Sequence, residues 1–158
     1  MKFDELLNAP TNMAICRAKT IPEGQNDTSE WVEGYYLLLN GRRHFVCNGY
    51  AEFDCGEFHP VLYPVEEDTI GFYTGVNDTK RTAEYPEGQK IFVGDIINGL
   101  HRFGMLFKSV ADFQDGSYGL SWEYNGIKHF SAFTSICNVE MEVVGNIFDN
   151  PEMIEEVA

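Results

Sequence analysis

From about Ile15 the chain consists of short apolar or alternating stretches separated by turn residues. Such stretches are typical of β-strands, whose successive side chains point to opposite faces. A type I′ turn needs positive φ at both central residues, which Asn and Gly tolerate, so an Asn-Gly pair between two such stretches predicts a two-residue β-hairpin. The chain has three of these pairs: Asn40-Gly41, Asn98-Gly99 and Asn125-Gly126.

A two-residue loop also sets the register of each hairpin. The predicted hairpins join residues 35–39 to 42–46, 92–97 to 100–103, and 121–124 to 127–130. Asn48-Gly49 is a fourth, weaker turn signal. The registers that follow place Leu39 opposite Arg42, Glu123 opposite Lys128, and Trp122 opposite His129.

Helix is expected only near the two ends of the chain. Residues 3–8 are predicted to form one or two turns before Pro10. After a last strand at residues 139–148, Asn150 suits an N-cap, Pro151 the first helical position and Glu152 the first turn. Residues 77–87 are polar and turn-rich, which predicts a surface loop or a join between two sub-barrels.

Composition bounds the size and the partners of the protein. With 158 residues, 44% of them hydrophobic, the chain can form one ordinary domain or two very small ones. Its formal charge of −14 repels phosphate backbones and favours a basic protein partner. The 11 basic residues are scattered, in pairs such as Arg42/Arg43 and Lys80/Arg81, so direct nucleic-acid binding is not expected.

The sequence shows neither a signal peptide nor an apolar run long enough to cross a membrane. We therefore expect the protein in the reducing cytoplasm of a host cell, without membrane association and with free thiols. Cys47, Cys55 and His59 invite a zinc site, with Cys137 as a fourth ligand. Their spacing lacks the Cys-x₂₋₄-Cys clips of structural zinc sites, which favours structural thiols, and we predict no metal and no cofactor.

Other catalytic patterns are weak. No signature of a cysteine hydrolase surrounds the cysteines or the four histidines. Neighbouring carboxylates, which could act as a catalytic acid and base, are expected from the acidic composition alone and indicate no such site. The stretch between Gly71 and Gly75 lacks the Gly-Lys-Ser/Thr ending of a phosphate-binding loop. The aromatic pairs Tyr35/Tyr36, Phe72/Tyr73 and Trp122/Tyr124 suit either a core or a binding surface.

Four segments in a fixed order resemble the YopX family of phage and prophage proteins. They read WVEGY at 31–35, TIGFYTG at 69–75, IFVGDII at 91–97 and EVVGNIFDNPE at 142–152. The chain departs from the family pattern in the longer stretch at 76–87 and in Val93, where the family has Glu. The resemblance implies a mainly β fold with small SH3-like barrels, and no established activity, cofactor or catalytic residue.

The matching residues suit turns, bulges and close backbone packing, so we interpret them as structural. A faint echo between residues 31–34 and 91–95 suggests two related sub-barrels, at about 14–76 and 88–150, within one domain of residues 1–158. The structural motif residues are Trp31, Gly34, Gly71, Tyr73, Gly75, Gly94, Asp95, Gly145, Asn146 and Pro151.

The sequence thus predicts an all-β phage or prophage accessory protein with SH3-like barrel character. Its expected role is that of a non-enzymatic protein-interaction module. An acidic inhibitor or nucleic-acid mimic that binds a basic host or phage protein is the alternative, and an enzyme with an unrecognised site is the third. The partner stays open, as does association between copies.

Overall fold

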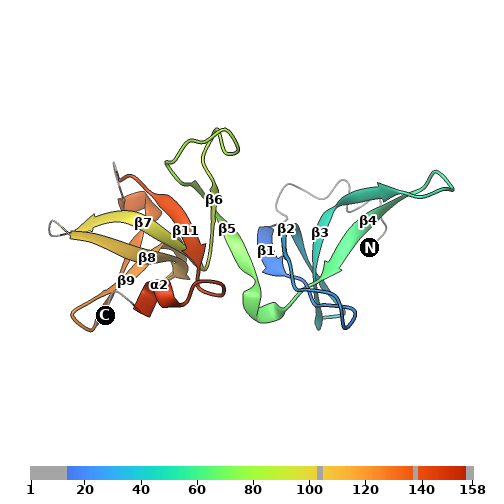
Figure 1. The fold of residues 1–158 in the computed structure, drawn as a ribbon, viewed down its shortest axis with the longest axis horizontal. Helices are drawn as coiled ribbons and strands as arrows, with labels where there is room; N and C mark the ends of the chain where they lie inside the picture. The colour runs from blue at the N-terminus through green and yellow to red at the C-terminus, as the bar shows by residue number, and fades with distance from the viewer. Residues whose placement is uncertain (1–13, 103–104, 137–138, 156–158) are drawn as a thin grey trace. The chain divides into compact units, whose positions relative to one another are not determined.

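The computed structural model describes residues 14–102, 105–136 and 139–155 (Figure 1). The chain divides into two compact units, Met1–Phe72 and Tyr73–Ala158. Each unit has its own cluster of buried apolar side chains. The boundary falls inside one strand, β5, so that its first two residues belong to the first unit and the others to the second.

The first unit is an antiparallel sheet in the order β4-β3-β2-β1-β5. Its strands are joined by tight turns, by a loop at residues 20–30 and by the 3₁₀-helix η1. The elements are β1 (Ile15–Lys19), β2 (Trp31–Leu39), β3 (Arg43–Glu52), β4 (Phe58–Pro64), η1 (Glu67–Thr69) and the start of β5 (Gly71–Asn77).

Five side chains from four segments form the core of the first unit: Cys16, Ala18, Val32, Val46 and Val65. Tyr36, Ile70 and Phe72 pack against this cluster. A buried valine contributes about 1.5–3 kcal/mol relative to an exposed one, so this small cluster is a main source of stability.

The second unit is an antiparallel sheet in the order β10-β9-β8-β7-β11, and the second half of β5 pairs with β6. Its core consists of Ile91, Ile97, Ala111, Leu120 and Met141. The elements are β6 (Lys90–Phe92), β7 (Asp95–Arg102), β8 (Met105–Gln114), β9 (Ser117–Tyr124), β10 (Ile127–Ala132), the 3₁₀-helix η2 (Phe133–Ser135), β11 (Glu142–Asn146) and α2 (Glu152–Glu155).

The polar segment between β5 and β6 is a loop, as predicted, and side-chain hydrogen bonds tie it to the rest of the second unit. The carboxylate of Asp78 accepts hydrogen bonds from the N–H groups of Gln89, at 2.8 Å, and Val143, at 3.1 Å. The Thr79 hydroxyl accepts from the N–H of Met141 at 2.7 Å. Two residues at the start of a long loop therefore hold its two ends together and fasten it beside β11.

The third predicted hairpin is confirmed. Glu123 pairs with Lys128 and Trp122 with His129 across a turn in which Asn125 and Gly126 have φ of 52° and 75°. The rings of Trp122 and His129 stack at 5.4 Å.

The register predicted for the first hairpin is wrong by one residue. Asn40 and Gly41 do have positive φ, and Arg42 N–H donates to Leu39 C=O. Arg42 then stays outside the ladder, so that Leu39 pairs with Arg43. Because a shift of one residue exchanges the faces of a strand, Tyr36 shares a face with buried Val46.

The second predicted hairpin is also wrong. Asn98 and Gly99 lie inside the continuous strand β7, where the pairing with β8 shifts between Asn98 and Leu100. Gly99 has φ +132°, and an added Cβ would lie 1.8 Å from the carbonyl oxygen of Glu140. Asn98-Gly99 is therefore a bulge that lets another segment approach closely. A hairpin turn that the sequence analysis missed lies at Asp115-Gly116.

The mainly β class is confirmed, with two antiparallel sheets. The SH3-like barrel is not confirmed, because the described strands form open orders whose end strands do not pair with each other. Two short internal 3₁₀-helices show that helix is not confined to the ends. The C-terminal helix is present as α2, whereas residues 3–8 lie outside the described residues. The tandem sub-barrels stay a prediction.

Candidate functional site

The hairpin of β3 and β4 extends well beyond the core of the first unit (Figure 1). A bulge at Asn48 and Gly49 marks where it leaves the core, because the β3–β4 register shifts between Cys47 and Tyr50 and Gly49 has φ +97°. Val46 and Cys47, just before the bulge, are buried. Every residue from 48 to 59 is exposed. We call residues 48–59 the arm.

The arm carries exposed aromatic side chains on both of its faces. Tyr50, Phe53 and Phe58 are 46%, 53% and 59% exposed. Tyr50 pairs with Pro60 and Glu52 with Phe58, so alternation places Tyr50 and Phe58 on one face. Phe53 packs edge-on against His59, with ring centroids 4.7 Å apart, on the other face. Large aromatic groups that are left in water are typical of surfaces that bind other proteins.

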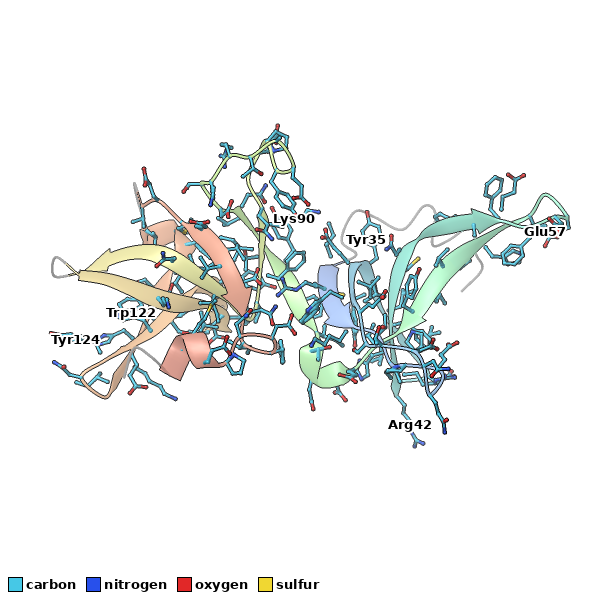
Figure 2. All side chains as sticks on the ribbon, in the orientation of Figure 1. Tyr35, Arg42, Glu57, Lys90, Trp122 and Tyr124 are labelled. Atoms are coloured by element: carbon cyan, nitrogen blue, oxygen red, sulfur yellow. The ribbon has the colours of Figure 1, made fainter. Side chains whose placement is uncertain are left out.

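The arm is also acidic. It contains the carboxylates of Glu52, Asp54 and Glu57 and no lysine or arginine. Glu57, near the tip in Figure 2, lies 3.2 Å from His59 Nε2. The arrangement presents aromatic rings flanked by carboxylates, which suits a partner with apolar pockets and basic groups.

A hollow of about 570 Å³ lies in the same unit and includes Asn48 at the base of the arm. Trp31, Tyr35 and Tyr63 supply its aromatic lining. The guanidinium of Arg17 lies 4.7 Å from the centroid of the Trp31 ring. The hollow and the arm share Asn48, and we call the two together the arm surface.

The motif residues of the first unit lie in strands rather than at catalytic positions. Trp31 opens β2 opposite Lys19 of β1. Gly34 lies so close to β3 that an added Cβ would be 2.2 Å from the Cys47 carbonyl oxygen. Gly71 is buried at the start of β5.

Two more motif residues lie in the part of β5 that belongs to the second unit. The Tyr73 hydroxyl donates to Asn77 Oδ1 at 2.6 Å, and its ring packs against Phe92 at 5.8 Å. Gly75 is exposed with φ +82°, a conformation that favours glycine.

The remaining motif residues meet at one place in the second unit. The carboxylate of Asp95 is buried and accepts a hydrogen bond from the N–H of Phe92 at 2.8 Å. Asn146, paired with Asp95, accepts from the N–H groups of Phe148 and Asp149 at 3.0 and 2.9 Å.

Gly145 and Pro151 complete this group. An added Cβ at Gly145 would lie 2.5 Å from the side-chain oxygen of Asn150. Pro151 follows Asn150 and directly precedes α2. These contacts shape turns and a helix start, which supports the structural interpretation; the need for each residue in folding stays a prediction.

The zinc arrangement that the cysteines invited is not assembled. Cys47 is buried at the base of the arm, and Cys55 is exposed near its tip. Within the described ranges no three His, Cys, Asp or Glu side chains are grouped as metal ligands. Cys137 lies outside those ranges.

The histidines and cysteines form no nucleophilic pair in the described part of the chain. His44 Nδ1 is hydrogen-bonded to the Tyr36 hydroxyl at 2.8 Å, and His44 Nε2 lies 3.5 Å from Glu67. Burial, with smaller contributions from Glu67 and Cys16, raises the pKa of Tyr36. A tyrosine with a raised pKa keeps its proton, which suits a structural hydrogen bond.

The aromatic residues of the arm were not among those predicted to form a binding surface. The predicted candidates were the pairs Tyr35/Tyr36, Phe72/Tyr73 and Trp122/Tyr124. The signal was present as Glu52-Phe53-Asp54 and Glu57-Phe58-His59, on either side of Gly56, where Phe53 lies between two acidic residues and Phe58 between an acidic residue and a histidine. A buried strand rarely has charged residues on both sides of an aromatic one.

Comparison with known proteins places the chain in a family. The family model described as YopX protein matches residues 25–155, and the chain therefore belongs to the YopX family. No significant match was found among curated proteins or solved structures. None of the described helices is long and apolar enough to cross a membrane.

Proposed function

We propose that this YopX-family chain is a phage or prophage accessory protein that acts in the host cytoplasm as a non-enzymatic protein-interaction module. The arm surface is its binding element. The observation that carries the proposal is the exposure of Tyr50, Phe53 and Phe58 on a ribbon that adds nothing to the core. An aromatic ring in water contributes little to folding, whereas the same ring in a partner's pocket is a typical binding hot spot.

The proposed partner is a basic protein with an apolar pocket. Three carboxylates in the arm and a formal charge of −14 on the chain attract such a surface. The second candidate is an acidic inhibitor or nucleic-acid mimic, which the carboxylates of the arm favour. In that role the charges contribute most of the affinity, and the rings serve only as spacers.

The test compares the wild type with a variant in which Tyr50 and Phe58 are both replaced by serine. The control is Phe113→Ser, because Phe113 lies in the second unit and is 52% exposed. Proteins captured from host or infected lysate by the wild type and by the control should be lost with the arm variant. An unchanged set of captured proteins would contradict the proposal.

A salt series separates the two candidates. Affinity that survives high salt but fails in the Tyr50/Phe58 variant supports the aromatic site. Affinity that falls steeply with salt, and with Glu52→Gln, Asp54→Asn and Glu57→Gln together, supports the charge-based role. A DNA duplex and a single strand serve as controls, and tight binding of either would contradict both.

A further inference from the structure

Strand β10 forms one end of the sheet in the second unit and pairs only with β9 among the described strands. The corresponding end strand of the first unit, β4, contains Pro60 and Pro64. Proline lacks an N–H and blocks the addition of another strand, a common protection of sheet edges. Strand β10, with the sequence IKHFSA, has no proline.

The turn geometry indicates which backbone groups of β10 point outward. In a two-residue hairpin the flanking residues, here Tyr124 and Ile127, exchange both backbone hydrogen bonds, and bonded pairs then recur at every second residue. The N–H and C=O of Lys128 and Phe130 therefore point away from β9. Neither outward N–H has a hydrogen-bond partner among the described residues. Two donors and two acceptors are thus available at the spacing of a partner strand.

A groove of about 560 Å³ lies across β8, β9 and β10 and reaches this edge at Lys128 and Phe130. Its lining includes the apolar side chains of Val110, Phe130 and Ile154 and the charged side chains of Lys128 and Glu123. Although Lys128 and Glu123 are opposite in register, no ion pair joins them, and Lys128 is exposed. Its ammonium group is available to a ligand.

We propose that β10 accepts an extended segment of a partner protein as an additional strand. The segment runs antiparallel to β10, with an acidic side chain beside Lys128 and, two residues earlier in its own sequence, an apolar side chain beside Phe130. Backbone hydrogen bonds provide the attachment, and the groove selects the alternate side chains. A second copy of this chain is disfavoured, because two molecules of charge −14 repel each other. This site lies in the second unit and does not depend on the function proposed for the arm.

The probe is a synthetic peptide, Ser-Val-Thr-Val-Thr-Glu-Thr-Ser, with blocked ends, whose antiparallel register places its Glu opposite Lys128 and its second Val opposite Phe130. Its binding to the full chain is followed by NMR, with hydrogen exchange of individual amides. We expect a Kd below about 1 mM and slowed exchange at Lys128 and Phe130. The same peptide N-methylated at Glu and at the second Val has lost the donors that face Lys128 and Phe130 and should not bind.

Variants of the protein test the same edge. Lys128→Glu should weaken binding about three- to fivefold, as expected for an exposed ion pair. Arg42→Glu, with the same charge change in the first unit, should not weaken it. Lys128→Pro removes an outward N–H and leaves the β9 ladder intact, so it should abolish binding.

Three results would overturn the proposal. One is the absence of binding to the wild type at about 1 mM peptide. Another is equal binding of the N-methylated peptide, which would show that the backbone of the edge is not used. The third is self-association of the protein that Lys128→Pro abolishes, which would make a second copy the occupant. If Lys128→Pro does not fold, Lys128→Glu and the N-methylated peptide still decide the matter.

Discussion

The carbonyl oxygen of Gly94 accepts a hydrogen bond from the N–H of Ile147 at 2.9 Å. The N–H of Gly94 donates in turn to the carbonyl of Ala111 at 2.8 Å. The segments 91–97 and 142–152, which both resemble the family pattern, therefore meet at one turn in the second unit. In this chain the two segments are joined here through backbone groups.

Replacement of Gly94 by alanine should destabilise the protein by about 1–2 kcal/mol, because Gly94 has φ +95° and its Cβ would lie 3.4 Å from the Phe148 ring. Urea unfolding measures the change. The control is Gly24→Ala, since a Cβ there meets its nearest atom, in Asp27, only at 3.5 Å and φ is ordinary. Equal stability of both variants would show that the turn tolerates a side chain.

The arm should be nearly neutral for folding. Phe58→Ala should change the free energy of unfolding by less than about 0.5 kcal/mol, since Phe58 is largely exposed. Val46→Ala, twelve positions earlier and fully buried, should reduce it by about 1–3 kcal/mol. The two variants are compared by thermal and urea unfolding. A strongly destabilised Phe58→Ala would mean that the arm belongs to the folding core.

Stability should fall in alkaline solution through Cys16. Burial, and secondarily Glu33, raises the pKa of this thiol from 9.0 to about 11. The folded state therefore holds the proton more tightly than the unfolded state does. The resulting stabilisation is complete below pH 9 and is lost as the pH rises toward 11.

The check is urea unfolding of the wild type and of Cys16→Ala at several pH values between about 8 and about 11. The wild type should lose more stability over this range than the variant does. Parallel pH profiles of the two proteins would argue against the raised pKa.

The loop between β5 and β6 should open when Asp78 is replaced. Asp78→Ala leaves the N–H groups of Gln89 and Val143 without their acceptors and should destabilise the protein by about 1–3 kcal/mol. Limited proteolysis should then cut between residues 79 and 88, where the wild type resists cleavage. The control is Glu84→Ala in the same loop, which is exposed. Identical cleavage of all three proteins would refute the anchoring role.

The sequence predicted the mainly β class and the third hairpin, because turn chemistry at Asn125-Gly126 is local. The same dipeptide at Asn98-Gly99 led to a wrong prediction of a hairpin turn. Its role depends on Glu140, which approaches Gly99 from a distant segment. No pattern within a few residues can reveal that approach. The predicted register of the first hairpin was wrong because the loop contains one additional residue, Arg42. The sequence has no distinct signal for this residue.

The candidate site was harder to predict than the fold. Aromatic residues such as Tyr50, Phe53 and Phe58 favour β-strands. The sequence pattern alone does not show whether such a strand lies over the core or extends beyond it. The bulge at Gly49 is where the strand leaves the core, whereas the Asn48-Gly49 pair in the sequence predicts only a weak turn.

The tight turn at Asn125-Gly126 makes the purified protein susceptible to deamidation during storage. Both residues are exposed, and glycine leaves the backbone nitrogen open to attack the asparagine side chain, which loses ammonia and forms a succinimide. Its hydrolysis yields aspartate or isoaspartate, each with one more negative charge, and isoaspartate inserts a methylene group into the main chain. That lengthened backbone no longer fits a two-residue loop. Stored samples should therefore deamidate at this hairpin, as at the equally exposed Asn40-Gly41 and Asn48-Gly49 pairs, and the change is visible as an acidic shift in isoelectric focusing.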